Sequence, residues 1–299
     1  MPAHTRNEAA TGTLYVVATP IGNMGDITLR ALEVLKAVPL VAAEDTRLTR
    51  RLWARHGIDT KLISFHAQSP PARLIELLRH LEGGLDLAVV TDAGTPLVSD
   101  PGADLVSAWA ARGGTVMPIP GASAVLAALV ASGLPSAHFA FEGFLPRRGK
   151  ERRHRLARIC ADERTTVLFE APGRAAATLA DLGQTCGPTR PAALCRELTK
   201  LHEEIWRDSL GELAARAAAQ TPRGEVTIVV AGAPADAGQA TPDIEGSRRE
   251  VDRLVGEGMS RSSAAREVAS RTGLPRRELF KPDSASGSPT RSEISARRG

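Results

Sequence analysis

Aliphatic residues fall into short runs along the first half of the chain, and stretches of mixed polarity separate these runs. The runs predict buried strands at residues 14–18, 40–43, 62–65, 85–90 and 116–119. Between them, apolar residues recur at helical spacing, which predicts helices at 28–36, 46–56, 71–81, 103–111 and 123–131. Strand and helix therefore alternate, an order typical of a parallel sheet that carries helices on both faces.

The second half of the chain also has mixed α/β character. Strands are expected at 166–169, 192–195 and 225–230, and helices at 150–160, 174–183 and 210–219. Beyond residue 233 the composition is that of a linker, and helical spacing returns after 247. We expect a disordered start (1–12), a first α/β domain with a parallel sheet (13–143), a second α/β domain (144–233), a linker (234–247), a small helical extension (248–281) and a disordered tail (282–299).

Composition excludes several classes of protein. Aromatic residues make up only 3% of the chain, which argues against an RNA binder that stacks bases on Phe and Tyr. The three cysteines are scattered, so neither a disulfide framework nor a zinc site is expected. The longest apolar run, 124–130, is far shorter than the roughly 20 residues that span a bilayer, and the N-terminus has no signal-like stretch. We expect a cytoplasmic protein with no membrane span.

Three loops rich in Gly and Pro follow predicted strands, at 19–26, 91–102 and 118–124. In open α/β sheets, ligands bind beyond the carboxyl ends of the strands, so three such loops at one edge predict a cleft. The stretch at 143–151 resembles a phosphate-binding P-loop, but its glycine spacing is one residue too long and Glu151 stands in the Ser/Thr position. The cleft is therefore expected to bind a ligand that is not held by phosphates.

Basic residues are concentrated at 147–158, where seven of twelve residues are Lys or Arg and Glu151 is the only acid. Two interpretations stay open for this basic block. It is either a solvated helix face or a surface that binds phosphate groups.

Several longer sequence segments are distinctive enough to indicate a protein family. These are TPIGNMGDITLRA (19–31), AEDTRLTRRL (43–52), VTDAGTPLVSDPG (90–102), PIPGASA (118–124), FEGFLPRRGKER (141–152), FEAPGR (169–174) and RELTKLHEE (196–204). Together they resemble the tetrapyrrole methylase superfamily of S-adenosylmethionine-dependent enzymes, and within it the branch that methylates cytidine 2′-hydroxyls of small-subunit ribosomal RNA. The chain departs from that pattern after His66, where an Asn-Glu pair is usual, and at Gly173, where a His is usual.

The resemblance implies two α/β domains with S-adenosyl-L-methionine in the cleft between them, a small helical C-terminal extension, and a homodimer. The residues that match the family's cofactor contacts are Pro20, Thr91, Asp92, Thr95, Ser123, Ala124, Glu170 and Leu198. The implied substrate is a decoding-centre cytidine in small-subunit ribosomal RNA, either as naked RNA or in the assembled small ribosomal subunit.

Methyl transfer to a ribose hydroxyl needs no metal, because the leaving group departs neutral, but the hydroxyl proton needs an acceptor. The candidate acceptors are Asp45, Glu44 and Asp100. The residues expected to contact RNA phosphates are Arg47, Arg147, Arg148, Lys150, Arg152, Arg153 and Arg155. Two alternatives stay open: methylation of a small tetrapyrrole, such as a corrin or sirohaem precursor, and a nucleic-acid-binding protein without enzymatic activity.

Overall fold

The computed structural model describes residues 11–234, 244–272 and 274–280 of the chain. Contacts divide the chain into two compact units, Met1–Ala233 and Pro234–Gly299. Most of the segments predicted to be disordered (1–12 and 282–299) or a linker (234–247) lie outside the described residues. The linker prediction runs too far at its end, because residues 244–247 already belong to a helix.

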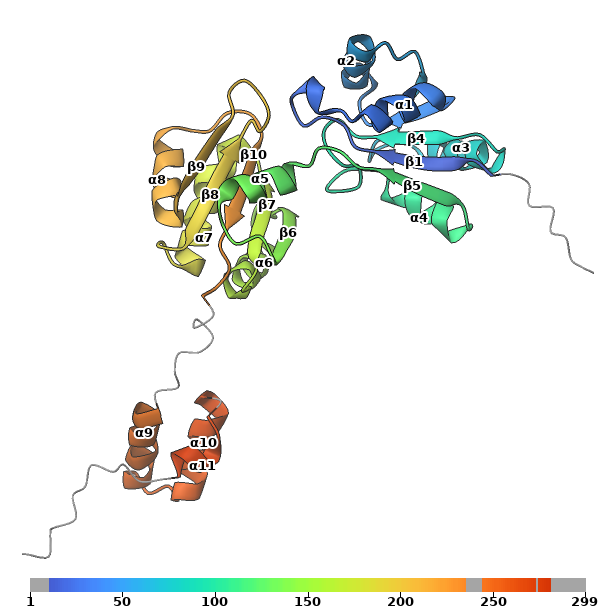
Figure 1. The fold of residues 1–299 in the computed structure, drawn as a ribbon. Coiled ribbons are helices and arrows are strands. Elements are labelled where there is room, and N and C mark those ends of the chain that lie inside the picture. Colours follow the sequence, from blue (N-terminus) through green and yellow to red (C-terminus); the bar gives the residue numbers. More distant parts are fainter. Residues whose placement is uncertain (1–10, 235–243, 273, 281–299) are drawn as a thin grey trace, which may run out of the picture. The chain divides into compact units, whose positions relative to one another are not determined.

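The first unit contains two sheets of five strands each (Figure 1). The strands of the first sheet lie in the order β3-β2-β4-β1-β5, and every neighbouring pair is parallel. Their bounds are β1 (Thr13–Val17), β2 (Leu40–Ala43), β3 (Lys61–Ser64), β4 (Leu87–Val90) and β5 (Thr115–Ile119). The helices between them are α1 (Leu29–Ala37), α2 (Thr46–His56), α3 (Pro71–Glu82) and α4 (Ala103–Ala111), with a short 3₁₀ turn η1 (Met24–Asp26).

Alternating residues of the parallel strands pack on opposite faces, so the sheet is covered on both sides. Leu14 and Val16 pack with the apolar residues of α3 and α4, whereas Val17 packs with those of α1 and α2. The parallel sheet predicted from the sequence is thereby confirmed.

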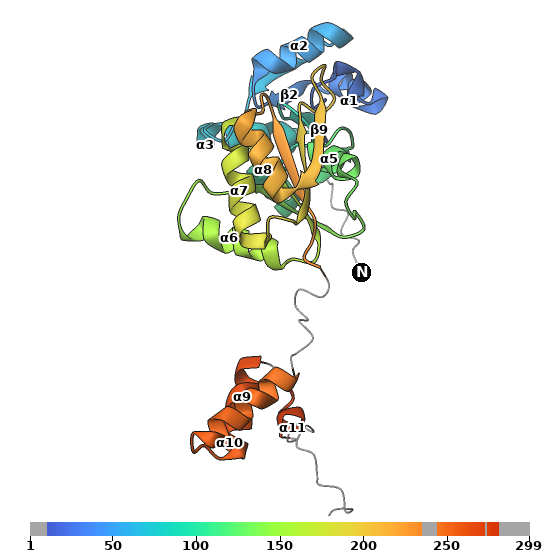
Figure 2. The same ribbon diagram turned by 90° about the vertical axis from the view of Figure 1, so that its left-hand side faces the viewer.

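The second sheet is mixed. Its order is β6-β7-β10-β8-β9, in which β6 and β7 are parallel and the other pairs are antiparallel. The strands are β6 (Phe139–Phe144), β7 (Thr165–Glu170), β8 (Pro191–Arg196), β9 (Glu204–Ser209) and β10 (Val226–Val230). One face is covered by α6 (Lys150–Ala161), α7 (Ala175–Cys186) and α8 (Leu210–Ala219), which face the viewer in Figure 2; a 3₁₀ turn, η2 (Pro172–Arg174), precedes α7.

The other face of the second sheet is covered by α5 (Ala124–Ser132), although this helix directly follows the first sheet in sequence. Val125, Ala128 and Leu129 pack there against strand residues such as Val167 and Val229. Since β6 also pairs within the second sheet, the chain passes from one sheet to the other between β5 and α5. The expected domain division at 143/144 therefore assigns α5 and β6 to the first domain, whereas both belong with the second sheet. Sequence patterns do not reveal which sheet an apolar helix covers.

The second unit contains α9 (Ile244–Gly256), α10 (Arg261–Thr272) and α11 (Arg276–Leu279) around a small apolar core. The predicted fold class, two α/β parts followed by a small helical extension, is confirmed. No helix among the described residues is long and apolar enough to cross a membrane.

Candidate active site

Four loops gather at the carboxyl edge of the first sheet, because its strands are all parallel. They follow β1, β2, β4 and β5. Thr19 and Gly94 tie the first and third of these loops together through a pair of backbone hydrogen bonds of 2.9 and 3.1 Å. The edge is therefore a fixed surface of loop backbone.

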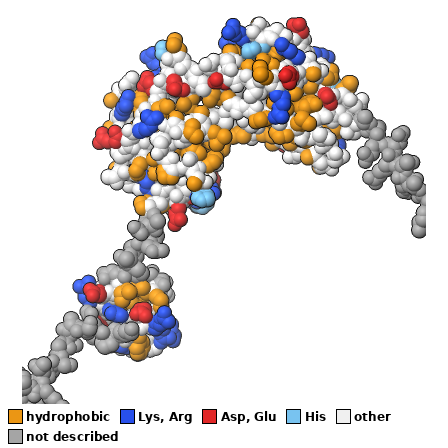
Figure 3. All heavy atoms as spheres, viewed as in Figure 1, with side chains coloured by type: hydrophobic (Ala, Val, Ile, Leu, Met, Phe, Trp, Pro, Cys, Tyr) orange, Lys and Arg blue, Asp and Glu red, His pale blue; other side chains and the backbone are white. Residues whose placement is uncertain are grey.

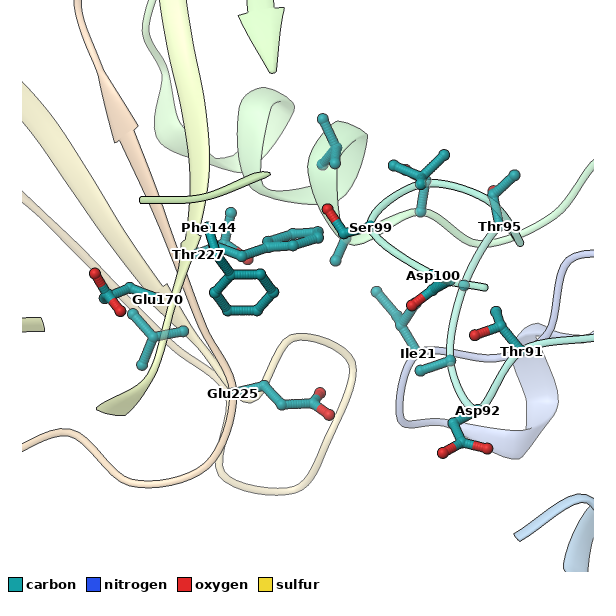
Figure 4. A pocket seen from close by; sticks show the side chains of 18 of the residues that line it. Ile21, Thr91, Asp92, Thr95, Ser99, Asp100, Phe144, Glu170, Glu225 and Thr227 are labelled. Carbon is teal, nitrogen blue, oxygen red and sulfur yellow. The ribbon is translucent and has the colours of Figure 1, made fainter. Parts of the chain in front are cut away.

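A cavity of about 390 Å³, here named the first cavity, lies between this edge and the second sheet. Its size falls within the ~300–1,000 Å³ of small-molecule sites in proteins. It is lined by eight residues proposed from the sequence: Glu44, Thr91, Asp92, Thr95, Asp100, Ser123, Ala124 and Glu170. In Figure 4, Thr91, Asp92 and Asp100 lie on one side of the cavity, and Phe144 and Thr227 lie across from them.

Three carboxylates on the first-sheet side lie close together. Oε2 of Glu44 accepts hydrogen bonds from the Thr91 hydroxyl at 2.7 Å and from the Asp92 backbone N–H at 3.4 Å. Burial raises the pKa of Asp100 to about 6, and the charges of Glu44 and Asp92 push it in the same direction. Burial also raises the pKa of Asp92. Such concentrated negative charge favours a cationic ligand, and the raised pKa of Asp100 suits a proton acceptor near neutral pH.

The loop 91–102 holds a strained backbone beside these carboxylates. Leu97 and Ser99 adopt left-handed conformations, with φ of 74° and 70°. A residue other than Gly in this region costs on the order of 1–3 kcal/mol, and such residues cluster at functional sites. Ser99 lines the first cavity, so the strain lies at the cavity wall.

A second cavity of about 310 Å³ adjoins the first. The two cavities share five lining residues: Ile21, Thr91, Asp92, Ala93 and Glu225. The remaining wall of the second cavity comes from the loop after β1, from α2, and from Lys200.

Comparison with known proteins decides the family. The sequence profile of the tetrapyrrole (corrin/porphyrin) methylases matches residues 13–214, about two thirds of the chain. The chain belongs to the tetrapyrrole methylase family. The resemblance inferred from the sequence is thereby confirmed, as are the expected enzyme class, a methyltransferase, and the expected methyl donor, S-adenosyl-L-methionine.

Two curated members of this family are similar over nearly the whole chain. "Ribosomal RNA small subunit methyltransferase I" of Synechocystis is 46% identical over 269 residues, covering 90% of this chain and 96% of its own. The protein of the same name from Micromonospora olivasterospora is 46% identical over 275 residues, covering 92% and 87%. Among solved structures, the methyltransferase CobJ aligns with a TM-score of 0.58 at 20% identity, covering 75% of this chain and 95% of its own, which supports the fold.

Two residues that match the family's cofactor contacts do not line the first cavity. Pro20 lines the second cavity instead. Leu198 is buried in the apolar cluster that holds Ile21 and α5.

Glu170 borders the first cavity, but its carboxyl group points away from it (Figure 4). The side chain is fully buried. Its oxygens accept hydrogen bonds from the Thr178 hydroxyl at 2.6 Å and from the Ala171 backbone N–H at 2.8 Å. The Glu170 carboxylate therefore anchors β7 to α7, and only the remainder of the residue can reach a ligand.

Asp45 lines neither of these two cavities. It is the N-cap of α2, where its side chain accepts a hydrogen bond of 2.8 Å from the Arg47 backbone N–H. Hydrogen bonds from the Arg47 guanidinium lower the pKa of Asp45 to about 2. A carboxylate with these partners is a poor proton acceptor, so the structure removes Asp45 from the candidates.

The basic block divides into exposed and internal residues. Arg152 is buried, donating hydrogen bonds to Asp181 at 2.6 and 2.9 Å, to the Thr178 hydroxyl at 3.1 Å and to the Pro146 carbonyl at 3.0 Å. Arg155 is largely buried against Glu142, with N–O distances of 2.7 and 3.0 Å. Both guanidinium groups are occupied inside the protein and do not have the exposure that an RNA contact needs. The exposed residues of the block are Arg147, Arg148, Lys150, Arg153 and Arg158.

The helical spacing of apolar residues in the sequence could have indicated that Arg152 is buried, although the number of basic residues around it suggested an exposed surface. Arg152 precedes the buried Leu156 and Ile159 by four and seven positions, so it lies on the inward face of α6. Its acidic partner at 181 is on another helix and could not be predicted.

Sequence reasoning missed the lining residues that the second sheet supplies. Thr227 lies near the start of β10, and Glu225 directly precedes this strand. Because β10 runs antiparallel to β7 and β8, its beginning meets their ends at the cavity. The run at 225–230 predicts a strand but not its direction. Phe144, at the end of β6, belongs to one of the family segments (141–152) but was not proposed as a site residue.

Proposed function

We propose that this chain transfers a methyl group from S-adenosyl-L-methionine to the ribose 2′-hydroxyl of a cytidine in small-subunit ribosomal RNA. The observation that carries this proposal is its 46% identity, over 90% of its length, to a relative named for small-subunit ribosomal RNA methylation. The position of the first cavity, at the carboxyl edge of a parallel sheet, supports it.

The residues of the first cavity fit the methyl donor. Glu44, Asp92 and Asp100 supply negative charge, and Ile21 and Phe144 supply apolar surface. When bound, S-adenosyl-L-methionine supplies a methyl group on a positively charged sulfur, together with an adenosine that apolar side chains can cover. Asp92 and Thr95 are placed to hold polar groups of the ligand, and Ser123 and Ala124 close the wall at the start of α5.

Asp100 is the best of the three proposed proton acceptors. Asp45 lies outside both cavities, and Glu44 is occupied by Thr91 and Asp92. Asp100 lines the first cavity, and its pKa of about 6 allows it to be ionised at neutral pH yet basic enough to accept a proton. While bound S-adenosyl-L-methionine would supply the methyl group to the ribose oxygen, Asp100 would accept the proton that leaves the hydroxyl.

RNA contacts are assigned to the exposed cations. Arg147, Arg148, Lys150 and Arg153 are exposed at the start of α6. Arg47 is 85% exposed, although one of its edges is paired with Asp45. Phosphate contacts of this kind position a substrate without reading its sequence.

A homodimer in the cytoplasm is part of the proposal. Large apolar side chains are exposed on α5 and β5, with 74% exposure for Val130, 52% for Leu126 and 43% for Met117. Figure 3 shows hydrophobic side chains gathered along the hollowed face of the first unit. An apolar surface of this kind is typical of a subunit interface. Sedimentation velocity on the full chain tests this part, and a monomer at micromolar concentration would contradict it.

The substrate is tested by offering alternatives to one preparation. The full chain is incubated with methyl-labelled S-adenosyl-L-methionine and with naked small-subunit ribosomal RNA, assembled small subunits or tetrapyrrole precursors. Label recovered as 2′-O-methylcytidine after digestion supports the proposal. Label on a base, or in a corrin or sirohaem precursor, contradicts it and favours the tetrapyrrole alternative that the family's fold also allows.

A further inference from the structure

The second cavity has walls from three parts of the first unit. The loop after β1 supplies Pro20 and Met24, α2 supplies one helical face, and the second sheet's loops supply Lys200 and Glu225. Near Met24 the loop is held to α2, because a ring nitrogen of His56 lies 3.3 Å from the Met24 carbonyl oxygen. The loop after β1 and α2 thus form one connected wall of the cavity.

The α2 face combines apolar side chains with one cation. Leu48, Arg51 and Leu52 are spaced three and four residues apart and therefore lie on the same side of the helix. Leu48 is 39% exposed, and Leu52 is buried beneath it. Arg51 is exposed and has no hydrogen-bond or ion-pair partner within the described residues. An unpaired guanidinium beside apolar side chains fits a nucleotide, whose phosphate can pair with the cation while the face of its base packs on the apolar groups.

The other cation of this cavity is already occupied. Nζ of Lys200 lies 2.8 Å from Glu197 and 3.1 Å from Glu225. Lys200 therefore holds the Glu225 carboxylate in place, at a position where this residue lines both cavities. This leaves Arg51 as the cation available to a ligand phosphate.

We infer that the second cavity binds a single unstacked nucleotide, the one that accepts the methyl group. The base lies on Pro20, Met24 and Leu48, the phosphate meets Arg51, and the ribose faces the wall that both cavities share. This inference rests on the proposed function, because an RNA substrate presents such a nucleotide and a small tetrapyrrole does not. A cavity of about 310 Å³ does not admit a duplex, so the nucleotide must leave its stack, as in enzymes that flip a base.

The inference is tested by a substitution that fills the second cavity with a larger side chain, at a position that is partly exposed. In Leu48→Trp, a bulky ring replaces a partly exposed residue of α2. Ile75→Trp is the matched control, because Ile75 is 49% exposed on α3 and lines neither cavity. Three quantities are measured on the full chain: KM for small-subunit ribosomal RNA, the affinity for S-adenosylhomocysteine, and the affinity for cytidine 5′-monophosphate in the presence of S-adenosylhomocysteine.

We expect Leu48→Trp to raise KM for RNA about tenfold or more and to abolish mononucleotide binding, with S-adenosylhomocysteine affinity within about twofold of wild type. Ile75→Trp should match wild type throughout. Equal KM and equal mononucleotide binding in the two variants would overturn the inference, as would the absence of mononucleotide binding to wild type. If wild type binds the mononucleotide in a Leu48-dependent way but labels no RNA, the proposed function fails while the subsite stands.

Discussion

The two sheets of the first unit have five strands each, yet they contribute to the active site in different ways. The parallel sheet places loops after β1, β2, β4 and β5 at one edge, where they bring three carboxylates together. The mixed sheet contributes the ends of β6 and β7 and the start of β10. Charged residues beside it are bound internally, as Glu170 and Arg152 are through the hydroxyl of Thr178. The first sheet therefore supplies the candidate reactive groups, and the second sheet supplies the opposite wall of the cavity.

The largest effect is expected from removing the proposed proton acceptor, Asp100, on the first-sheet side. Asp100→Asn should lower kcat about 100-fold or more, the usual contribution of a positioned base. Asp45→Asn is the matched control, because asparagine keeps the N-cap of α2, and its kcat should stay within about threefold of wild type. Steady-state kinetics on ribosomal RNA distinguish the two, and equal losses would contradict the assignment of Asp100.

The same carboxyl group determines a pH dependence. Because burial raises the pKa of Asp100 to about 6, kcat should fall as the pH drops below about 6 and level off above about 7. A raised carboxyl pKa means that the folded protein binds the proton more tightly than the unfolded chain. The associated stability is present at low pH and lost as the pH rises through about 6. Asp100→Asn should therefore increase Tm over that of wild type, and this increase should be larger at about pH 7.5 than at about pH 5. An equal increase at both pH values would contradict a raised pKa for Asp100.

A smaller effect is expected from the exposed half of the basic block. Replacing Arg147, Arg148, Lys150 and Arg153 by Gln should raise KM for RNA about tenfold and leave S-adenosylhomocysteine affinity unchanged. The salt slope of RNA binding should also fall by about 0.7–0.9 units for every phosphate group that is no longer neutralised. Arg152→Gln is the contrast, since it should lower Tm and leave the salt slope intact. An unchanged slope in the quadruple variant would mean that the block is a solvated helix face.

The smallest effect on activity is expected from a substitution in the helices that cover the second sheet. Thr178→Val removes the hydroxyl that links Glu170 to Arg152 and leaves a buried carboxylate with one donor fewer. Unfolding by denaturant should show a loss of about 1–3 kcal/mol, with kcat near wild type where the variant is folded. A large loss of kcat in the folded variant would show that this layer does more than support the site.

The sequence predicted the parallel sheet better than the mixed one, for a physical reason. Buried parallel strands are continuous apolar runs, and their polar carboxyl ends all meet at one edge, so Glu44, Asp92 and Asp100 could be placed together in advance. In the mixed sheet, β9 lies at an edge and has only two apolar residues, Ile205 and Trp206, side by side, so no strand pattern marked it and it was not predicted. The direction of β10, the sheet covered by α5 and the partner of Arg152 all depend on contacts distant in sequence. Those contacts explain why Glu225 was missed and why Arg152 was taken for an RNA contact.

The first cavity, at the carboxyl edge of the parallel sheet, is the proposed site of the methyl donor. Calorimetric titration with S-adenosylhomocysteine tests it most directly, on wild type, Asp92→Ala and Asp59→Ala. Asp59 is an exposed acid that lines neither cavity, so its variant controls for the loss of charge. We predict that Asp92→Ala lowers the affinity for S-adenosylhomocysteine about tenfold or more, the effect of losing one hydrogen bond to a charged group. Asp59→Ala should bind it as wild type does. Wild-type affinity in Asp92→Ala would contradict the claim and place the methyl donor elsewhere.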